Sequence, residues 1–241
     1  MRTEICASSL RSAINAAEAG ADRIELCSEL LLGGVTPSYG MIREVVRKID
    51  IPVYVLIRPR SGNFTYTAEE LEIMRNDIRM CAELGCKGVV SGVLKKDHTI
   101  DSVATAGLME AAGEMDFTFH RGFDWTPDQK DAATRLVNIG CKRVLSSGGM
   151  PSAHEGIDRL IFLDRIFMDT LTIMPGGGIN ERNIGAFKKA GFREIHFSAS
   201  VMHRSDEAKP AISFMPQSLP DDQTFYFSDK EKIKRMVNLV K

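Results

Sequence analysis

Hydrophobic and polar positions along the chain follow two periods, one typical of helices and one typical of buried strands. Short apolar runs such as residues 53–58 and 88–93 have the length of strands. The segments between such runs have a helical period, and Leu10, Ala13 and Ile14, for example, fall on one helix face. The pattern therefore predicts strands and helices in regular alternation.

A joint between helix and strand recurs along the chain. It is present in EAGADRIEL (18–26), ELGCKGVVS (83–91), NIGCKRVLS (138–146) and KAGFREIHF (189–197), with a looser copy in EAAGEMDFTF (110–119). Each joint ends a helix, places glycine where left-handed backbone costs least, and then enters a strand. Repeated joints of this kind predict a series of α–turn–β units.

Eight strands are predicted, each followed by a helix. They cover residues 4–7, 23–27, 53–58, 88–93, 116–120, 143–147, 171–174 and 194–198. Eight such units in 241 residues match the ~250 residues typical of a (β/α)8 TIM-type barrel, so we expect a single barrel domain over residues 1–241. A doubly wound open sheet is the alternative, because composition does not distinguish a closed sheet from an open one.

Residues 202–228 interrupt this alternation between the eighth strand and the last helix. The segment is too long for a plain connection, and we expect it to be an insertion that serves as a lid or a subunit contact.

Helix starts are predicted where Thr36 and Thr126 each precede a proline, and where Thr67 and Glu70 fit a capping box.

Alternation along each strand assigns its side chains to the two faces of the barrel. The face toward the helices must be apolar, so Ile5, Ile24 and Val55 are expected outside. The opposite positions then face the interior, and they are Glu4, Cys6, Glu25, Cys27, Arg58, His120, His196 and Ser198, with Arg60 as a further candidate beyond the strand end. Most of these lie near the C-terminal ends of strands, where barrel enzymes build their sites.

Two glycine-rich loops follow strands and precede helices, namely SSGGM (146–150) and PGGGIN (175–180). Backbone N–H groups at such turns bind anions, and the phosphate site of barrels usually follows strands seven and eight. The sequence thus predicts an anion site, for which the candidate residues are Arg60, Ser147, Gly148, Gly177, Gly178 and Ser198. A structural ion network, in which Glu4 and Glu25 neutralise Arg58 and Arg60, is the alternative.

Composition and charge narrow the function classes. A formal net charge of -1 gives no indication of a nucleic-acid or membrane-surface binder. No apolar run reaches spanning length, and residues 1–10 lack the pattern of a signal peptide, so the expected compartment is the cytoplasm. The five cysteines show no C-x-x-C spacing and are expected to be reduced thiols.

Several motifs in this order resemble the copper homeostasis protein CutC family. They are EICASSLRSAINAAEAGADRIELCSELLLGGVTPS, IRPRSGNFTY, TFHRGFDW, RVLSSGG and MPGGGI, between residue 3 and about residue 200. The resemblance implies a TIM-type barrel, a cytoplasmic homo-oligomer and a role in copper(I) handling. It also implies that Cys6 and Cys27 are the copper ligands.

Two functions follow, and the residues leave open whether the protein is an enzyme. Paired thiolates are soft ligands that select copper(I), and His120 or His196 could add a third donor. Alternatively, the arginines suit a small phosphorylated or carboxylated metabolite at the barrel mouth, with the glycines of the anion site. In that enzyme the candidate catalytic residues are Glu25 as base, His120 as acid–base partner, Arg58, His196, and Asp124, which would orient His120 or pair with Arg121.

Overall fold

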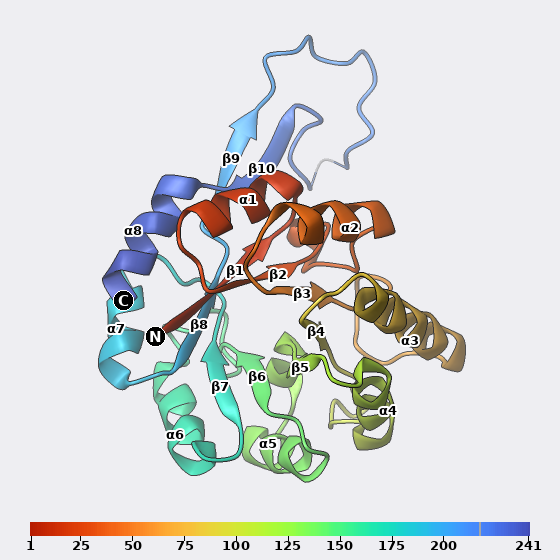
Figure 1. Cartoon of the computed structure of the whole chain (residues 1–241), viewed down its shortest axis with the longest axis vertical. Helices are drawn as coiled ribbons and strands as arrows, with labels where there is room; N and C mark the ends of the chain where they lie inside the picture. Colours follow the sequence, from red (N-terminus) through yellow and green to blue (C-terminus); the bar gives the residue numbers. More distant parts are fainter. Residues whose placement is uncertain (217) are drawn as a thin grey trace.

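The computed structural model describes residues 1–216 and 218–241. Eight parallel strands form one sheet in the order β7-β6-β5-β4-β3-β2-β1-β8, and this sheet curls into a barrel (Figure 1). The strands are β1 (Arg2–Ala7), β2 (Arg23–Leu26), β3 (Val53–Leu56), β4 (Gly88–Ser91), β5 (Asp116–Phe119), β6 (Arg143–Ser146), β7 (Thr172–Pro175) and β8 (Glu194–Phe197).

The last strand closes the barrel against the first. β8 pairs in parallel with β1, with Arg2 opposite Glu194 and Ile5 opposite Phe197. A single parallel bridge between Gly176 and His196 joins the end of β7 to β8. The predicted TIM-type barrel is therefore confirmed, and the doubly wound open sheet is wrong.

Helices surround the sheet, as Figure 1 shows. They are α1 (Leu10–Glu18), α2 (Tyr39–Lys48), α3 (Ala68–Glu83), α4 (Ser102–Ala112), α5 (Gln129–Asn138), α6 (Ile157–Phe167), α7 (Ile184–Ala190) and α8 (Lys230–Val240), with the short 3-10 helices η1 (Leu30–Leu32) and η2 (Arg121–Trp125). Among the residues that the structure describes, no helix has the length and apolar character needed to cross a membrane.

The predicted alternation of side chains along the strands is confirmed. Ile5, Ile24 and Val55 are fully buried in the apolar layer between the sheet and the helices. A separate cluster fills part of the barrel interior, and it consists of Cys6, Cys27, Tyr54, Leu56 and Val90. Hydrophobic burial on the outer face thus leaves the inner face free for polar side chains.

The helix starts were predicted with mixed success. Thr67 and Glu70 form the capping box of α3. The prediction at Thr36 is wrong, because Ser38 caps α2 and Thr36 accepts a hydrogen bond from the backbone N–H of Arg58. The prediction at Thr126 is also wrong, because the carboxylate of Asp128 caps α5. In both cases a side-chain oxygen after the proline satisfies the first N–H groups of the helix.

Part of the segment 202–228 forms a hairpin that the sequence did not predict. Strands β9 (Ser200–Arg204) and β10 (Thr224–Ser228) pair in antiparallel fashion beside α1, and the chain between them extends away from the barrel (Figure 1). The hairpin is fixed where the N–H of Ser228 donates to Ser12 Oγ at 3.0 Å. Its roles as a lid or a subunit contact stay predictions; position 217, inside this segment, lies outside the described residues.

Candidate functional site

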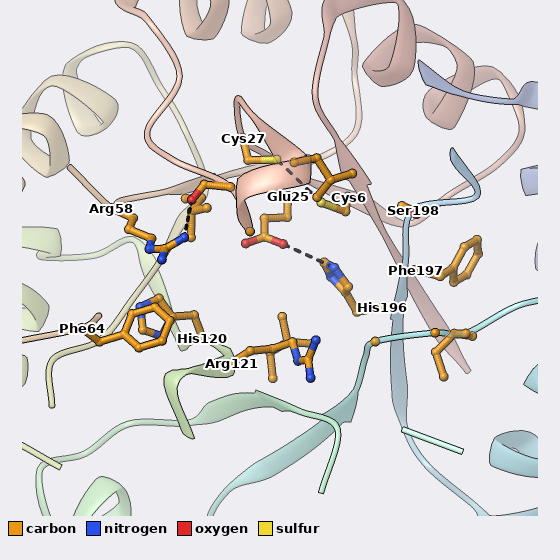
Figure 2. A pocket seen from close by; sticks show the side chains of 18 residues that line it. Cys6, Glu25, Cys27, Arg58, Phe64, His120, Arg121, His196, Phe197 and Ser198 are labelled. Carbon is orange, nitrogen blue, oxygen red and sulfur yellow. Dashed lines mark hydrogen bonds and ion pairs between the residues drawn. The ribbon is translucent and has the colours of Figure 1, made fainter. Parts of the chain in front are cut away.

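A cavity of about 320 Å³ lies at the C-terminal ends of the barrel strands. Figure 2 shows polar side chains from several strands converging on it. They include Cys6, Glu25, Cys27, Arg58, His120, Arg121, His196 and Ser198, and the turn Gly177-Gly178 also lines the cavity. The sequence named all of these as site residues except Arg121.

Two thiols lie side by side at the edge of this cavity. Cys6 is on β1 opposite Glu25 of β2, and Cys27 directly follows β2. This register brings the two Sγ atoms within 3.7 Å of each other, and both residues are buried. The contact with Cys27, burial, and the negative charges of Glu25 and Glu4 raise the pKa of the Cys6 thiol. Cys6 is therefore a thiol at neutral pH, and a metal must displace its proton.

His196 lies between two carboxyl groups. Its Nδ1 atom is 2.7 Å from Glu4 Oε1, and its Nε2 atom is 3.4 Å from Glu25 Oε2 (Figure 2). Burial alone would lower the pKa of His196, but the hydrogen bond with Glu4 and the charges of Glu25 and Glu4 raise it above its ordinary value. The imidazole is thus held in place from Nδ1, with Nε2 facing Glu25.

The two carboxyl groups behave differently. Burial raises the pKa of Glu25 to about 7, with the charge of His196 opposing the rise and the charge of Glu4 adding to it. Burial also acts on Glu4, but Arg23 and His196 outweigh it and lower the pKa of Glu4 to about 2. Glu25 therefore exchanges a proton near neutral pH, whereas Glu4 stays ionised.

An ion network beneath the cavity keeps Glu4 charged. Arg23 pairs with both Glu4 and Glu194, and Arg143 Nε lies 2.8 Å from Glu194 Oε2. The sequence predicted an inward Glu4 but assigned no role to Arg23 or Arg143. Arg23 lies two residues before Glu25 on β2 and therefore shares its face, so strand alternation could have found it.

Neither Arg58 nor Arg60 forms the predicted ion network with Glu4 and Glu25. Arg58 donates to the backbone carbonyls of Leu32, Gly34 and Gly62 at 3.2, 2.9 and 2.6 Å, and within the described part of the chain it has no carboxylate partner. Its side chain lines the cavity.

The prediction that Arg60 belongs to an anion site at the mouth is wrong. Arg60 pairs with Glu70 of α3 and donates to the carbonyl of Thr65 at 2.9 Å, and it does not line the cavity. The reason is that β3 ends at Leu56, so alternation no longer fixes the direction of a side chain four residues later.

His120 follows β5 and lines the cavity. Its Nδ1 atom accepts a hydrogen bond from the N–H of Gly122 at 3.2 Å, so the ring proton of the neutral form is on Nε2. Burial, with a smaller contribution from the charge of Arg58, lowers the pKa of His120 to about 3. Nε2 has no hydrogen-bond partner within the described residues. His120 is therefore a neutral hydrogen-bond donor.

Asp124 pairs with Arg121, which was one of its two predicted roles. Its Oδ2 atom accepts from Arg121 Nε at 2.9 Å, and its Oδ1 atom accepts from Ser146 Oγ at 2.6 Å. Ser147 and Gly148, predicted for the anion site, belong to this group beside the cavity rather than to its lining. Asp124 makes no hydrogen bond with His120 among the described residues, so it positions Arg121.

One group in this site has the donor atoms of a metal centre. Single ligand atoms of Cys6, Glu25 and His196 all lie within 4.8 Å of one another, and Cys27 Sγ is next to Cys6. With metal–sulfur bonds of about 2.3 Å, one ion could contact both sulfurs. The fold and the site together define a TIM-type barrel protein with a thiol, imidazole and carboxyl cluster at its C-terminal mouth.

Comparison with known proteins gives the family. The family model for the CutC family matches residues 1–201, and the chain belongs to this family. A family protein CutC from Xanthomonas axonopodis pv. citri is 44% identical over 200 residues, which are 83% of each chain. One from Pasteurella multocida is 38% identical and covers 97% of this chain and 96% of its own.

A solved structure agrees with this assignment. The crystal structure of a Streptococcus agalactiae protein, assigned to copper homeostasis under the name CutC, is 34% identical with a TM-score of 0.78. The match covers 82% of this chain and 98% of that one. The motifs that suggested the family from the sequence alone therefore identified it correctly.

Proposed function

We propose that the protein binds copper(I) through Cys6 and Cys27 and acts in copper homeostasis. The observation that carries the proposal is the 3.7 Å separation of the two Sγ atoms at the barrel mouth. Thiolates are the soft ligands that copper(I) prefers over oxygen donors. The copper homeostasis assignment of the Streptococcus agalactiae relative supports the same reading.

His196 is the third ligand in this proposal. With metal–sulfur bonds of about 2.3 Å, two sulfurs 3.7 Å apart subtend about 110° at the ion, which suits three or more ligands better than a linear pair. His196 Nδ1 is bonded to Glu4, which leaves Nε2 for the ion. A carboxylate that fixes the other ring nitrogen is the usual support of a histidine ligand.

Glu25 would take up a proton when copper(I) binds. Both thiols must lose their protons to become ligands. An oxygen of Glu25 is within 4.8 Å of Cys6 Sγ, and its pKa of about 7 lets it accept a proton near neutral pH. Glu25 would take up one of the two protons, and the other would be released to bulk water.

The setting of the site suits copper(I) handling in a reducing compartment. All five cysteines are free thiols, which is the state expected in the cytoplasm.

The family also leads us to expect a homo-oligomer. The exposed side chains of Ile212 and Phe214, on the segment after β9, are candidate contacts between subunits.

Anaerobic titration with copper(I) against a competing chelator tests the proposal. We expect Cys6→Ala/Cys27→Ala to lose at least about a hundredfold in affinity, a loss of about 3 kcal/mol. The matched control is Cys81→Ala/Cys86→Ala, which removes two other buried thiols, both outside the cavity lining. Equal affinity in the wild type and the Cys6/Cys27 variant would rule the site out.

A second candidate function is acid–base catalysis on a small anionic metabolite. It is favoured by Glu25, a buried carboxyl group with a pKa of about 7 that lies 3.4 Å from His196 Nε2. Groups tuned to neutral pH are suited to proton transfer. NMR of a metabolite extract incubated with wild type and with Glu25→Gln tests it, since turnover should be present only with the wild type. No change in any metabolite with the wild type would count against catalysis.

A further inference from the structure

We propose that Arg58, His120 and Arg121 form a second binding site in the cavity, for the carboxylate or phosphate group of a small organic anion. In Figure 2 His120 and Arg121 lie across the cavity from the two thiols, and Arg58 lies at its left edge. The proposal does not rest on copper binding, which uses other side chains. It concerns binding alone, and the same Arg58 and His120 would hold the anionic metabolite of the second candidate function.

Arg58 is a buried cation without an anionic partner. Only 5% of its surface is exposed, and its three hydrogen bonds go to neutral carbonyl groups. Its Nε atom is buried and has no acceptor among the described residues. Burying a guanidinium without a carboxylate is unfavourable, and an anion in the cavity would relieve that cost.

His120 offers a second donor without an acceptor. Gly122 donates to Nδ1 and the ring is neutral, so the buried Nε2–H has no acceptor among the described residues, and His120 lines the cavity. Phe64 packs against the ring with the two ring centres 4.5 Å apart, and it also lies under the guanidinium of Arg58. Both donor groups therefore contact the same aromatic side chain.

Arg121 supplies the accessible charge of the site. Asp124 accepts from its Nε, and Ser147 Oγ accepts from its Nη2 at 2.7 Å, so the planar fork has a fixed orientation. The third nitrogen, Nη1, has no such partner in the described chain. A Cβ atom on Gly177 would lie 3.0 Å from Nη1, so this glycine leaves the guanidinium room beside the cavity.

The chemistry of these groups selects the ligand. Two guanidinium groups and a neutral N–H donor match the acceptor oxygens of a carboxylate or phosphate. A cavity of about 320 Å³ holds a small organic molecule rather than a polymer. The ligand is therefore a small metabolite with at least one oxyanion group.

Inorganic phosphate and malonate are suitable probes, one for each type of oxyanion. We expect at least one of them to raise the melting temperature of the wild type in a saturable way, beyond sodium chloride at equal ionic strength. Which of the two binds distinguishes a phosphate ligand from a carboxylate ligand. If neither stabilises the protein beyond sodium chloride, the proposal is overturned.

Two variants locate the binding. Arg121→Gln removes the accessible charge, and His120→Asn keeps an acceptor near the N–H of Gly122 but removes the Nε2 donor. Each should weaken binding of the probe about tenfold or more by calorimetry, as expected for a hydrogen bond to a charged group. Arg235→Gln, at an exposed ion pair with Glu181, is the control and should bind as the wild type does.

The result is separable from that of the copper experiment. Arg121→Gln should keep the copper(I) affinity of the wild type, and Cys6→Ala/Cys27→Ala should keep its affinity for the anion. Wild-type affinity for the anion in both Arg121→Gln and His120→Asn would place the anion elsewhere and overturn the proposal.

Discussion

The Nδ1 atom of His196 lies 2.7 Å from Oε1 of Glu4, although the two residues are 192 positions apart in the chain. The pair joins the first strand of the barrel to the last, since Glu4 is opposite His196 in the register of β1 and β8. It also directs Nε2 toward Glu25 in the cavity. This one contact therefore links the two strands that close the barrel and also fixes the imidazole ring of His196 at the barrel mouth.

Glu4→Gln should destabilise the protein, and less so in acid. Removing one partner of a buried ion pair costs about 3–5 kcal/mol. The pKa of Glu4 is about 2 in the fold against an ordinary 4.5, so its stabilisation is present above pH 4.5 and is lost as the pH falls toward 2. Urea unfolding at pH 7 and pH 3 measures this, and an equal loss at both pH values would contradict the account.

Glu25→Gln should have the opposite dependence on pH. Because the pKa of Glu25 is raised from 4.5 to about 7, its ionisation costs stability as the pH rises through this range. The variant should gain up to about 3 kcal/mol relative to the wild type between pH 5 and pH 8. The exposed Glu114→Gln is the control, and the same gain there would show that the effect does not come from the cavity.

Gly34→Ala should disturb the thiol pair. Gly34 has φ +82, and a Cβ there would lie 2.6 Å from Leu56 Cδ2 and 3.7 Å from Cys27 Sγ. Gly20 has nearly the same φ, +83, but open space around it, so Gly20→Ala pays only the backbone cost of about 1–2 kcal/mol.

The difference between the two alanine variants isolates the contact. We expect Gly34→Ala to be less stable than Gly20→Ala by about 1–3 kcal/mol, because it overpacks the barrel interior. It should also bind copper(I) more weakly, whereas Gly20→Ala should bind as the wild type does. Equal stability and equal copper affinity in both variants would show that the thiols tolerate the added methyl group.

His120 should stay neutral over the whole physiological range. Burial lowers its pKa to about 3, and the N–H of Gly122 donates to Nδ1. Long-range ¹H–¹⁵N NMR should therefore show the Nε2–H tautomer from pH 5 to pH 8. A ring that titrates within that range, or that carries its proton on Nδ1, would refute this assignment.

The sequence predicted the barrel well, because its signals are repeated and local. Glycine joints and apolar alternation placed eight strands, and alternation put Cys6, Glu25 and His196 on the inner face. The placement of these three side chains depends only on the two-residue period of a strand. Packing against the helices requires the outer face to be apolar, which identifies the inner face.

Side chains beyond the strand ends could not be placed in this way. Arg60 pairs with Glu70 instead of entering the mouth, because it lies in a loop with no fixed period. Arg121 lines the cavity because η2 turns there and Asp124 holds its guanidinium, a contact that strand alternation does not encode. Long-range hydrogen bonds decide such positions, and they depend on the complete fold.

The most direct test of the copper site is anomalous diffraction at the copper edge from crystals loaded with copper(I) without oxygen. The account predicts one strong peak within about 2.3 Å of both Cys6 Sγ and Cys27 Sγ, next to His196 Nε2. A mouth without such a peak, with copper bound only at other thiols or at the surface, would contradict it.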